Sequence, residues 1–165
     1  MASLRELGER LASSRLGTWL FLNVLPHIDR PLLRLSRGYL SVSLGQPVIL
    51  LETIGAKTGA IRATPLMCLL LGDELALVAS NGGSSRSPGW YFNLRKNPEA
   101  TVTLRGQRRQ MLAREATGAE RDELWKRAVA FYSGYRTYQE RAGARRIPLL
   151  VLSPAGSQAG ADPHA

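Results

Sequence analysis

Residues 48–80 read VILLETIGAKTGAIRATPLMCLLLGDELALVAS, and the expected fold class follows from this stretch. Val48–Ile54 is rich in β-branched residues and precedes the turn Gly55–Gly59, so it is predicted to be a strand. Arg62–Leu71 is the expected returning strand. A tight turn at Gly72–Asp73 leads to a third strand over Leu75–Ala79. Three strands joined by short turns predict an antiparallel meander, not a βαβ unit.

The next segment changes from strand to loop and then to helix. Ser80–Pro88 is rich in glycine and serine and must expose many backbone N–H groups. Ser87 is the expected N-cap, with Pro88 at the first helical position. The helix Gly89–Lys96 is predicted to end before Asn97-Pro98.

Further elements complete a mainly β, α+β domain. Thr101–Leu104 and Arg108–Arg114 are predicted to form a hairpin across Arg105-Gly106. Ala119–Tyr138 is an amphipathic helical stretch with an expected break near Ser133-Gly134. Ile147–Leu152 is the expected last strand.

The two ends differ from this central part in composition. Residues 1–43 show apolar residues at helix-like spacing and form the predicted N-terminal helical segment. Its basic, tryptophan-containing part, residues 16–37, fits either the interface of a membrane or packing against the barrel, and the sequence leaves both open. Residues 44–154 form the expected barrel domain, and residues 155–165 a disordered tail.

Charge and composition narrow the function classes. The 165-residue chain has 22 Lys and Arg against 13 Asp and Glu, a formal net charge of +9, which favours an anionic ligand. Basic residues do not alternate with aromatic ones as in nucleic-acid-binding motifs, so nucleic acid is not an expected partner. No signal peptide or bilayer-spanning stretch is apparent. The expectation is a cytoplasmic protein, with peripheral membrane contact as an option.

The chain lacks the side chains that most enzymes use for their own chemistry. His27 and His164 have no neighbouring nucleophile, and Cys68 is the single cysteine, so neither a catalytic triad nor a metal site is expected. A GxGxxG dinucleotide fingerprint is also absent from the sequence. An enzyme with this inventory would borrow its chemistry from a cofactor.

Three features could build a site for such a cofactor. The turn after the first strand carries Lys57, Thr58 and Arg62, which suit a phosphate or carboxylate. The Ser80–Ser87 loop leads into a helix N-terminus, where free amides favour anions. Tyrosines at every third position, which would lie near one face of a helix, are Tyr132, Tyr135 and Tyr138. Taken alone, each pattern is more often structural than functional.

In this order the motifs are similar to one family. The segments Gly-x-Lys-Thr-Gly-x-x-Arg (55–62), Ser-x-Gly-Gly to Pro-x-Trp-Tyr-x-Asn-Leu (80–94) and Tyr-x-x-Tyr-x-x-Tyr (132–138) resemble the deazaflavin-dependent nitroreductase family. The resemblance covers residues 46–154. It implies a split β-barrel of the flavin-reductase/pyridoxamine-phosphate-oxidase-like type that uses coenzyme F-420.

The resemblance also implies roles for single residues. Tyr132, Tyr135 and Tyr138 would line the acceptor pocket, with Tyr135 the best candidate for a hydrogen bond to the acceptor. Two departures remove potential phosphate partners, Ala56 for an arginine and Asn81 for a lysine, and Met67 replaces an aromatic residue of some members. Coenzyme contacts are implied for Lys57, Thr58, Gly59, Arg62, Thr64, Pro65, Ser80, Asn81, Gly82, Gly83, Trp90, Tyr91 and Asn93.

The implied reaction is hydride transfer from the reduced coenzyme to a flat acceptor, such as a quinone, a nitroaromatic compound or an enone. The alternative is a barrel that binds FMN, haem or another ligand without reductase activity. The sequence does not specify the oligomeric state.

Overall fold

The stretch VILLETIGAKTGAIRATPLMCLLLGDELALVAS folds into four strands of a computed structural model that describes residues 47–156. They are β1 (Val48–Ile54), β2 (Ile61–Met67), β3 (Leu69–Leu71) and β4 (Glu74–Val78). The predicted strand Arg62–Leu71 is therefore two strands. Cys68 separates them because its N–H leaves the ladder and donates to the carbonyl of Pro47 (3.1 Å).

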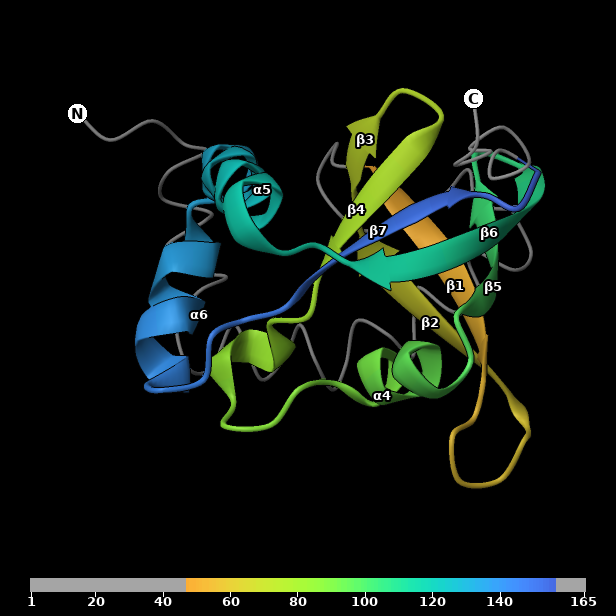
Figure 1. Cartoon of the computed structure of the whole chain (residues 1–165), viewed down its shortest axis with the longest axis horizontal. Coiled ribbons are helices and arrows are strands. Elements are labelled where there is room, and N and C mark those ends of the chain that lie inside the picture. Colours follow the sequence, from red (N-terminus) through yellow and green to blue (C-terminus); the bar gives the residue numbers. More distant parts are fainter. Residues whose placement is uncertain (1–46, 157–165) are drawn as a thin grey trace, which may run out of the picture.

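This interruption closes the sheet into a barrel. The seven antiparallel strands follow the order β2-β1-β5-β6-β7-β4-β3, which puts β2 and β3 at opposite edges. A single residue joins these two edge strands. The edges can meet across one residue only if the sheet curls round on itself, as Figure 1 shows. The expected split β-barrel is confirmed, and the meander around β1 to β4 is part of it.

The remaining elements follow the predicted order. A single 3-10 turn, η1 (Asn81–Gly83), precedes α4 (Gly89–Lys96), and the hairpin of β5 (Glu99–Leu104) and β6 (Gln107–Glu115) comes next. The helical stretch after it consists of α5 (Gly118–Phe131) and α6 (Gly134–Ala142), and β7 (Leu149–Pro154) enters the sheet between β6 and β4.

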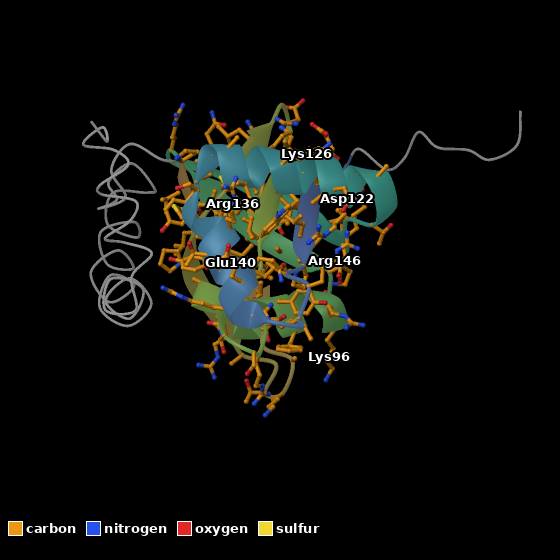
Figure 2. The ribbon with its side chains drawn as sticks, turned by 90° about the vertical axis from the view of Figure 1, so that its left-hand side faces the viewer. Lys96, Asp122, Lys126, Arg136, Glu140 and Arg146 are labelled. Carbon is orange, nitrogen blue, oxygen red and sulfur yellow. The ribbon has the colours of Figure 1, made fainter. Side chains whose placement is uncertain are left out.

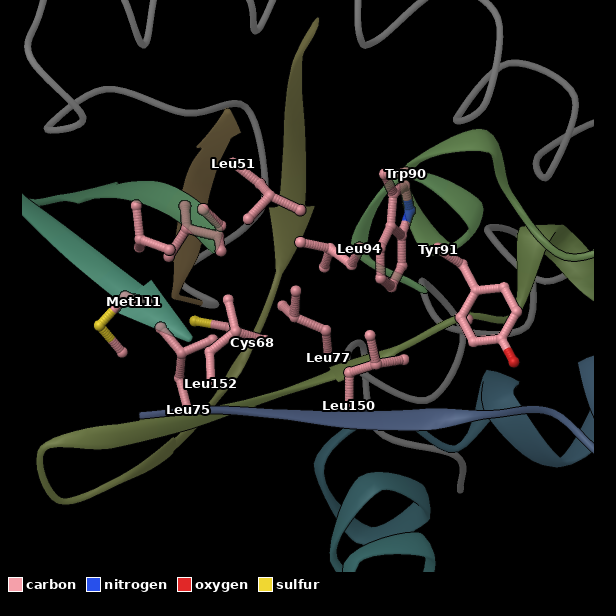
Figure 3. Packing of buried hydrophobic residues seen from close by; sticks show 14 residues of the cluster. Leu51, Cys68, Leu75, Leu77, Trp90, Tyr91, Leu94, Met111, Leu150 and Leu152 are labelled. Atoms are coloured by element: carbon pink, nitrogen blue, oxygen red, sulfur yellow. The ribbon is translucent and has the colours of Figure 1, made fainter. Parts of the chain in front are cut away.

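Period-two alternation gives the barrel two hydrophobic clusters. In β7, Leu150 and Leu152 point into the barrel, whereas Leu149 and Val151 belong to a second cluster under α5 and α6. The inner cluster also receives Trp90, Tyr91 and Leu94 from α4, as Figure 3 shows. The helix α4 is thereby fixed against the barrel interior. On the other side, α5 and α6 cover the sheet and present charged residues such as Lys126, Arg136 and Glu140 outward (Figure 2).

One local expectation needs correction. Pro88, not Ser87, is the N-cap of α4, because Pro88 is extended (φ −67°, ψ 158°) and the helix begins only at Gly89. The expected break in the helical stretch Ala119–Tyr138 is present: α5 ends at Phe131, Tyr132 is extended (φ −144°, ψ 106°), and α6 begins at Gly134. At the C-terminal end, Ala155 and Gly156 form a turn, in which the N–H of Ala155 donates to Gln110 (3.0 Å). The predicted N-terminal helical segment and residues 157–165 lie outside the described residues.

Candidate functional site

A cavity of about 1080 Å³ opens between β2, the β1–β2 turn, the segment 80–89, α4 and α6. Its walls come from parts of the chain that are far apart in sequence, and the barrel brings them together. The cavity combines a cationic rim, a polar loop and a wall of aromatic side chains. Each wall is built by a different local device.

The β1–β2 turn supplies two of the cations. The N–H of Gly59 donates to the carbonyl of Gly55 (2.8 Å), and Gly59 adopts a φ of +71° that an L side chain rarely adopts. Lys57, in this turn, and Arg62, in β2, are both exposed, and both line the cavity. Within residues 47–156 neither side chain has a hydrogen-bond or ion-pair partner.

The helix α4 holds this turn in place. The side chain of Asn93 accepts a hydrogen bond from the N–H of Ala56 (2.9 Å) and donates one to the hydroxyl of Thr53 (3.0 Å). Lys96 donates from Nζ to the carbonyl of Ala56 (2.6 Å). Both backbone polar groups of Ala56 are thus bound to α4, although the arginine expected at this position is missing.

The loop after β4 forms a second wall. Asn81, Gly82 and Gly83 have φ values of +49°, +62° and +81°. A Cβ atom on Gly83 would lie 2.6 Å from the backbone oxygen of Tyr138, so this glycine allows the loop to approach α6 closely. Arg86 is exposed on the same loop and lines the cavity, and its guanidinium has no hydrogen-bond or ion-pair partner among residues 47–156. It is a third rim cation.

The helix α4 contributes Trp90, Phe92 and Asn93 to the lining. Tyr91 faces elsewhere, because its hydroxyl donates to Glu115 (2.9 Å) at the end of β6. Burial, and next the hydrogen bond to Glu115, raise the pKa of Tyr91. Its place in the helix is structural, whereas Trp90 and Asn93 meet the cavity.

The three tyrosines cluster although they do not share one helix. Tyr132 ends α5, while Tyr135 and Tyr138 belong to α6, and all three are buried. The Tyr132 and Tyr135 rings meet edge to face with centroids 5.2 Å apart, and the hydroxyls of Tyr132 and Tyr138 lie 3.3 Å apart. Tyr135 and Tyr138 line the cavity, and Tyr132 lies behind them.

Burial keeps the Tyr135 hydroxyl protonated. Loss of solvent raises the pKa of Tyr135 above its ordinary value, and the neighbouring Tyr138 and Cys68 act in the same direction. A protonated phenol at the cavity wall can donate a hydrogen bond to an oxygen of a bound molecule. It cannot act as a base near neutral pH.

Most of the residues expected at the site meet in this cavity. Four do not line it: Gly59, Gly83, Tyr91 and Tyr132. Gly59 and Gly83 instead shape the backbone around it. Arg86 also lines the cavity but could not be selected from the sequence, where it is one basic residue among many. The lining includes the expected Lys57, Thr58, Arg62, Thr64, Pro65, Ser80, Asn81, Gly82, Trp90, Asn93, Tyr135 and Tyr138.

Residues 47–156 contain neither a candidate metal site nor a candidate membrane span. No group of three or more His, Cys, Asp or Glu side chains in this range could hold a metal ion. No helix there is long and apolar enough to cross a membrane.

The curled seven-stranded sheet and the cavity with its cationic rim define the chain as a split-barrel protein with a site suited to an anionic ligand. A family model described as "F420H(2)-dependent quinone reductase" matches residues 33–154, and the chain belongs to this family. It is therefore an F-420-dependent oxidoreductase, and the resemblance to the deazaflavin-dependent enzymes is confirmed.

Known relatives agree with this family. An F420H(2)-dependent quinone reductase of Mycobacterium tuberculosis is 38% identical over 110 residues, which are 65% of this chain and 73% of the relative. A second, putative reductase of that organism is 33% identical over 66% of this chain and 90% of its own. A solved F420-H2 dependent reductase is 39% identical with a TM-score of 0.60, over 65% of this chain and 94% of that one.

Proposed function

We propose that the cavity binds coenzyme F-420 with its anionic part at the rim formed by Lys57, Arg62 and Arg86, and that it reduces a quinone beside Tyr135. The observation that carries this proposal is that one cavity combines three cations, which have no side-chain partner among residues 47–156, with a wall of buried tyrosines. Neither feature alone would require a cofactor.

The residues present fit this coenzyme. Its phosphodiester and glutamate tail are anionic, and charge-assisted hydrogen bonds to Lys and Arg are the strong type. Thr58 and Ser80 add hydroxyl groups beside the cations. Small-molecule sites commonly enclose about 300–1,000 Å³, and a cavity of about 1080 Å³ accommodates a large coenzyme together with part of an acceptor.

The apolar wall suits the flat parts of both ligands. Pro65, Met67, Val78 and Trp90 line the cavity between the rim and the tyrosines. Such side chains exclude water and leave stacking as the main contact of a planar ring. When bound in its reduced form, the coenzyme supplies a hydride. The task of the chain is to hold the acceptor against the coenzyme in a fixed orientation.

Tyr135 is the proposed acceptor-contacting residue. Its hydroxyl, kept neutral by burial, would donate a hydrogen bond to a carbonyl oxygen of the quinone, where negative charge grows during reduction. Tyr138 reaches the same cavity and its hydroxyl is close to that of Tyr132. The pair would hold the ring of Tyr135 in place through the mutual contacts of the three rings.

Nitroaromatic compounds and enones remain further candidate acceptors, because the side chains do no covalent work that would restrict the reaction. A lipid-soluble quinone could be delivered at a bilayer surface, and we propose peripheral contact through residues 16–37. This part of the proposal rests on their sequence. A solved relative with 35% identity and a TM-score of 0.62, over 77% of this chain and 94% of that one, is described as a domain-swapped dimer. We propose that a dimer is accessible to this chain too.

A titration tests the ligand, and a screen tests the acceptor. The full-length protein is titrated with oxidised coenzyme F-420, FMN and haem, with absorbance and fluorescence as readouts. Saturable binding of F-420 and turnover of a quinone by the reduced coenzyme are expected. Binding of FMN or haem with no affinity for F-420 would support the carrier alternative. For the membrane contact, the full-length protein should bind anionic vesicles through residues 16–37 and therefore sediment with them. If the protein stays in the supernatant at every lipid concentration, the membrane contact is ruled out.

A further inference from the structure

Arg145 binds the loop that forms one wall of the cavity, although Arg145 itself does not line it. Its Nη2 donates to the carbonyls of Ser80 (2.8 Å) and Ser84 (2.7 Å), and its Nε donates to Ser84 as well (2.9 Å). Its Nη1 donates to the carbonyl of Ala79 (3.2 Å) and to the hydroxyl of Ser87 (3.3 Å). All three guanidinium nitrogens are thus used on one loop.

The loop needs such support because it has little structure of its own. Between β4 and α4 it contains only the short η1 turn and a few internal hydrogen bonds, such as the one from Nδ2 of Asn81 to the carbonyl of Arg86 (3.0 Å). Its side chains are small, and three successive residues have positive φ. A flexible loop of this kind would sample many conformations, and an external clamp selects one.

The clamp is itself fixed. Gln139 on α6 donates from Nε2 to the carbonyl of Arg145 (2.8 Å) and accepts a hydrogen bond from the N–H of Ile147 (3.0 Å). The N–H of Arg145 donates to Ala142 at the end of α6 (3.1 Å). The loop is therefore bound to the helix that carries Tyr135 and Tyr138.

The contacts of Arg145 also orient the loop amides. In a trans peptide, the N–H points opposite to the C=O, and the described residues contain no cis bond. When the carbonyls of Ser80 and Ser84 face Arg145, the N–H groups of Asn81 and Ser85 face the other way. Ser80 and Asn81 line the cavity and Arg145 does not, so the N–H of Asn81 is turned away from Arg145 toward the ligand side.

The charge of Arg145 is not neutralised by a carboxylate. In the described part of the chain no acidic oxygen lies within ion-pair distance of its guanidinium, and burial lowers the pKa of Arg145. An arginine side chain nevertheless stays charged in proteins. Carbonyl dipoles alone hold the cation. A positive charge behind a loop adds to the attraction that the rim cations exert on an anion.

We infer that Arg145 is a positioning residue for the anionic part of the coenzyme: it orders the 80–87 loop and directs the loop amides to the cavity. This inference rests on the proposed function, because the ligand of the loop is the coenzyme named there. The neighbouring Arg146 provides a matched control. Arg146 is exposed and pairs with Asp122 (2.5 Å) on the outer side, as Figure 2 shows, and it has no contact with the loop.

Hydrogen exchange of the ligand-free protein tests the positioning directly. In Arg145→Met, the amides of residues 80–87 should exchange about tenfold faster or more, while the strands keep their protection. Arg145→Lys retains the charge but cannot reach four acceptors from one nitrogen, so it should restore little of the protection. Arg146→Met, with the same change in net charge, should exchange like the original protein.

Coenzyme titration completes the test. The Kd for F-420 should rise about tenfold or more in both Arg145 variants and remain within about twofold in Arg146→Met. The kcat with saturating coenzyme should change much less. The inference is overturned if the amides of residues 80–87 exchange at the original rate in Arg145→Lys and Arg145→Met. It is also overturned if these amides exchange faster in the variants but the Kd for F-420 does not change. If the original protein fails to bind F-420, the proposed function fails, and the exchange result still decides whether Arg145 orders the loop.

Discussion

The N–H of Ala56 donates a 2.9 Å hydrogen bond to Oδ1 of Asn93, and this contact links the β1–β2 turn, which carries Lys57, to α4, which lines the cavity. The other end of the Asn93 amide donates to Thr53, which is buried. The side chain of Asn93 therefore holds the turn that carries Lys57 against the end of β1. Asn93 is half-buried and lines the cavity, so a ligand would meet its amide as well.

Asn93→Ala should weaken both folding and coenzyme binding. Two hydrogen bonds are lost and buried groups remain unpaired, which costs about 1–3 kcal/mol of unfolding free energy. Displacement of the turn should raise the Kd for F-420 by about tenfold. Asn97→Ala is the control, because Asn97 accepts a bond only from the N–H of Glu99 and lies outside the cavity. Equal Kd values in Asn93→Ala and Asn97→Ala would show that Asn93 does not position the turn.

The rim cations should act additively and through charge. Lys57→Ala, Arg62→Ala and Arg86→Ala should each weaken coenzyme binding by about 1–3 kcal/mol, with a smaller effect on turnover at saturation. The affinity of the original protein should fall with salt, and each variant should show a weaker salt dependence. Lys126→Ala removes one exposed charge on α5, away from the cavity, and should leave the Kd unchanged. If it weakens binding as much as the rim variants do, net charge and not the rim is responsible.

Tyr135→Phe removes a hydroxyl and keeps the ring. The rate of quinone reduction should fall by about 10²-fold or less, as expected for a single hydrogen bond to the acceptor, while coenzyme affinity should stay constant. Tyr91→Phe is the matched control, because its hydroxyl binds Glu115 outside the cavity. A Tyr135→Phe enzyme with the original rate for every acceptor would leave Tyr135 with a packing role only.

Much of this arrangement could be predicted from sequence, and the failures have local causes. Segments rich in β-branched residues and glycine-containing turns located most of the strands, because these signals depend on nearest neighbours. The split at Cys68 depends on the path of the chain between two distant sheet edges, which no local pattern contains. The break at Tyr132 was placed within one or two residues by Ser133-Gly134.

The site shows the same division. Lys57, Arg62 and the tyrosines were recognisable as motifs. Arg145 was not, because its importance comes from contacts with residues about 60 positions away. Tyr91 is next to Trp90 in the sequence but does not line the cavity, since adjacent residues of a helix point in different directions. Long-range contacts were thus the part that the sequence could not supply.

Cys68 should make the stability of the fold dependent on alkaline pH. Burial raises the pKa of its thiol from 9.0 to about 12. Above pH 9 the unfolded chain releases this proton and the folded chain keeps it, so stability falls as pH rises. Between pH 8.5 and 10, Cys68 should account for a loss of about 1 kcal/mol in denaturant unfolding. Cys68→Ala should be less stable at neutral pH but lack this part of the decline. If the original protein and Cys68→Ala lose the same stability over this pH range, other groups cause the decline, and the tyrosines are the first candidates.

Gly134 should be required by the ring of Tyr132. A Cβ atom at residue 134 would lie 2.3 Å from Cζ and 2.5 Å from the hydroxyl oxygen of Tyr132, distances that no side chain tolerates. Gly134→Ala must therefore displace a buried ring that contacts both Tyr135 and Tyr138, at a cost of about 1–3 kcal/mol in unfolding free energy. Gly89 is the matched control: it also begins a helix, and a Cβ there meets nothing within 4 Å. Gly89→Ala should be neutral or stabilising by up to about 1 kcal/mol, because alanine restricts the unfolded chain. If both variants melt at the same temperature, the ring of Tyr132 is free to move aside, and the close contact at Gly134 does not fix the tyrosine cluster.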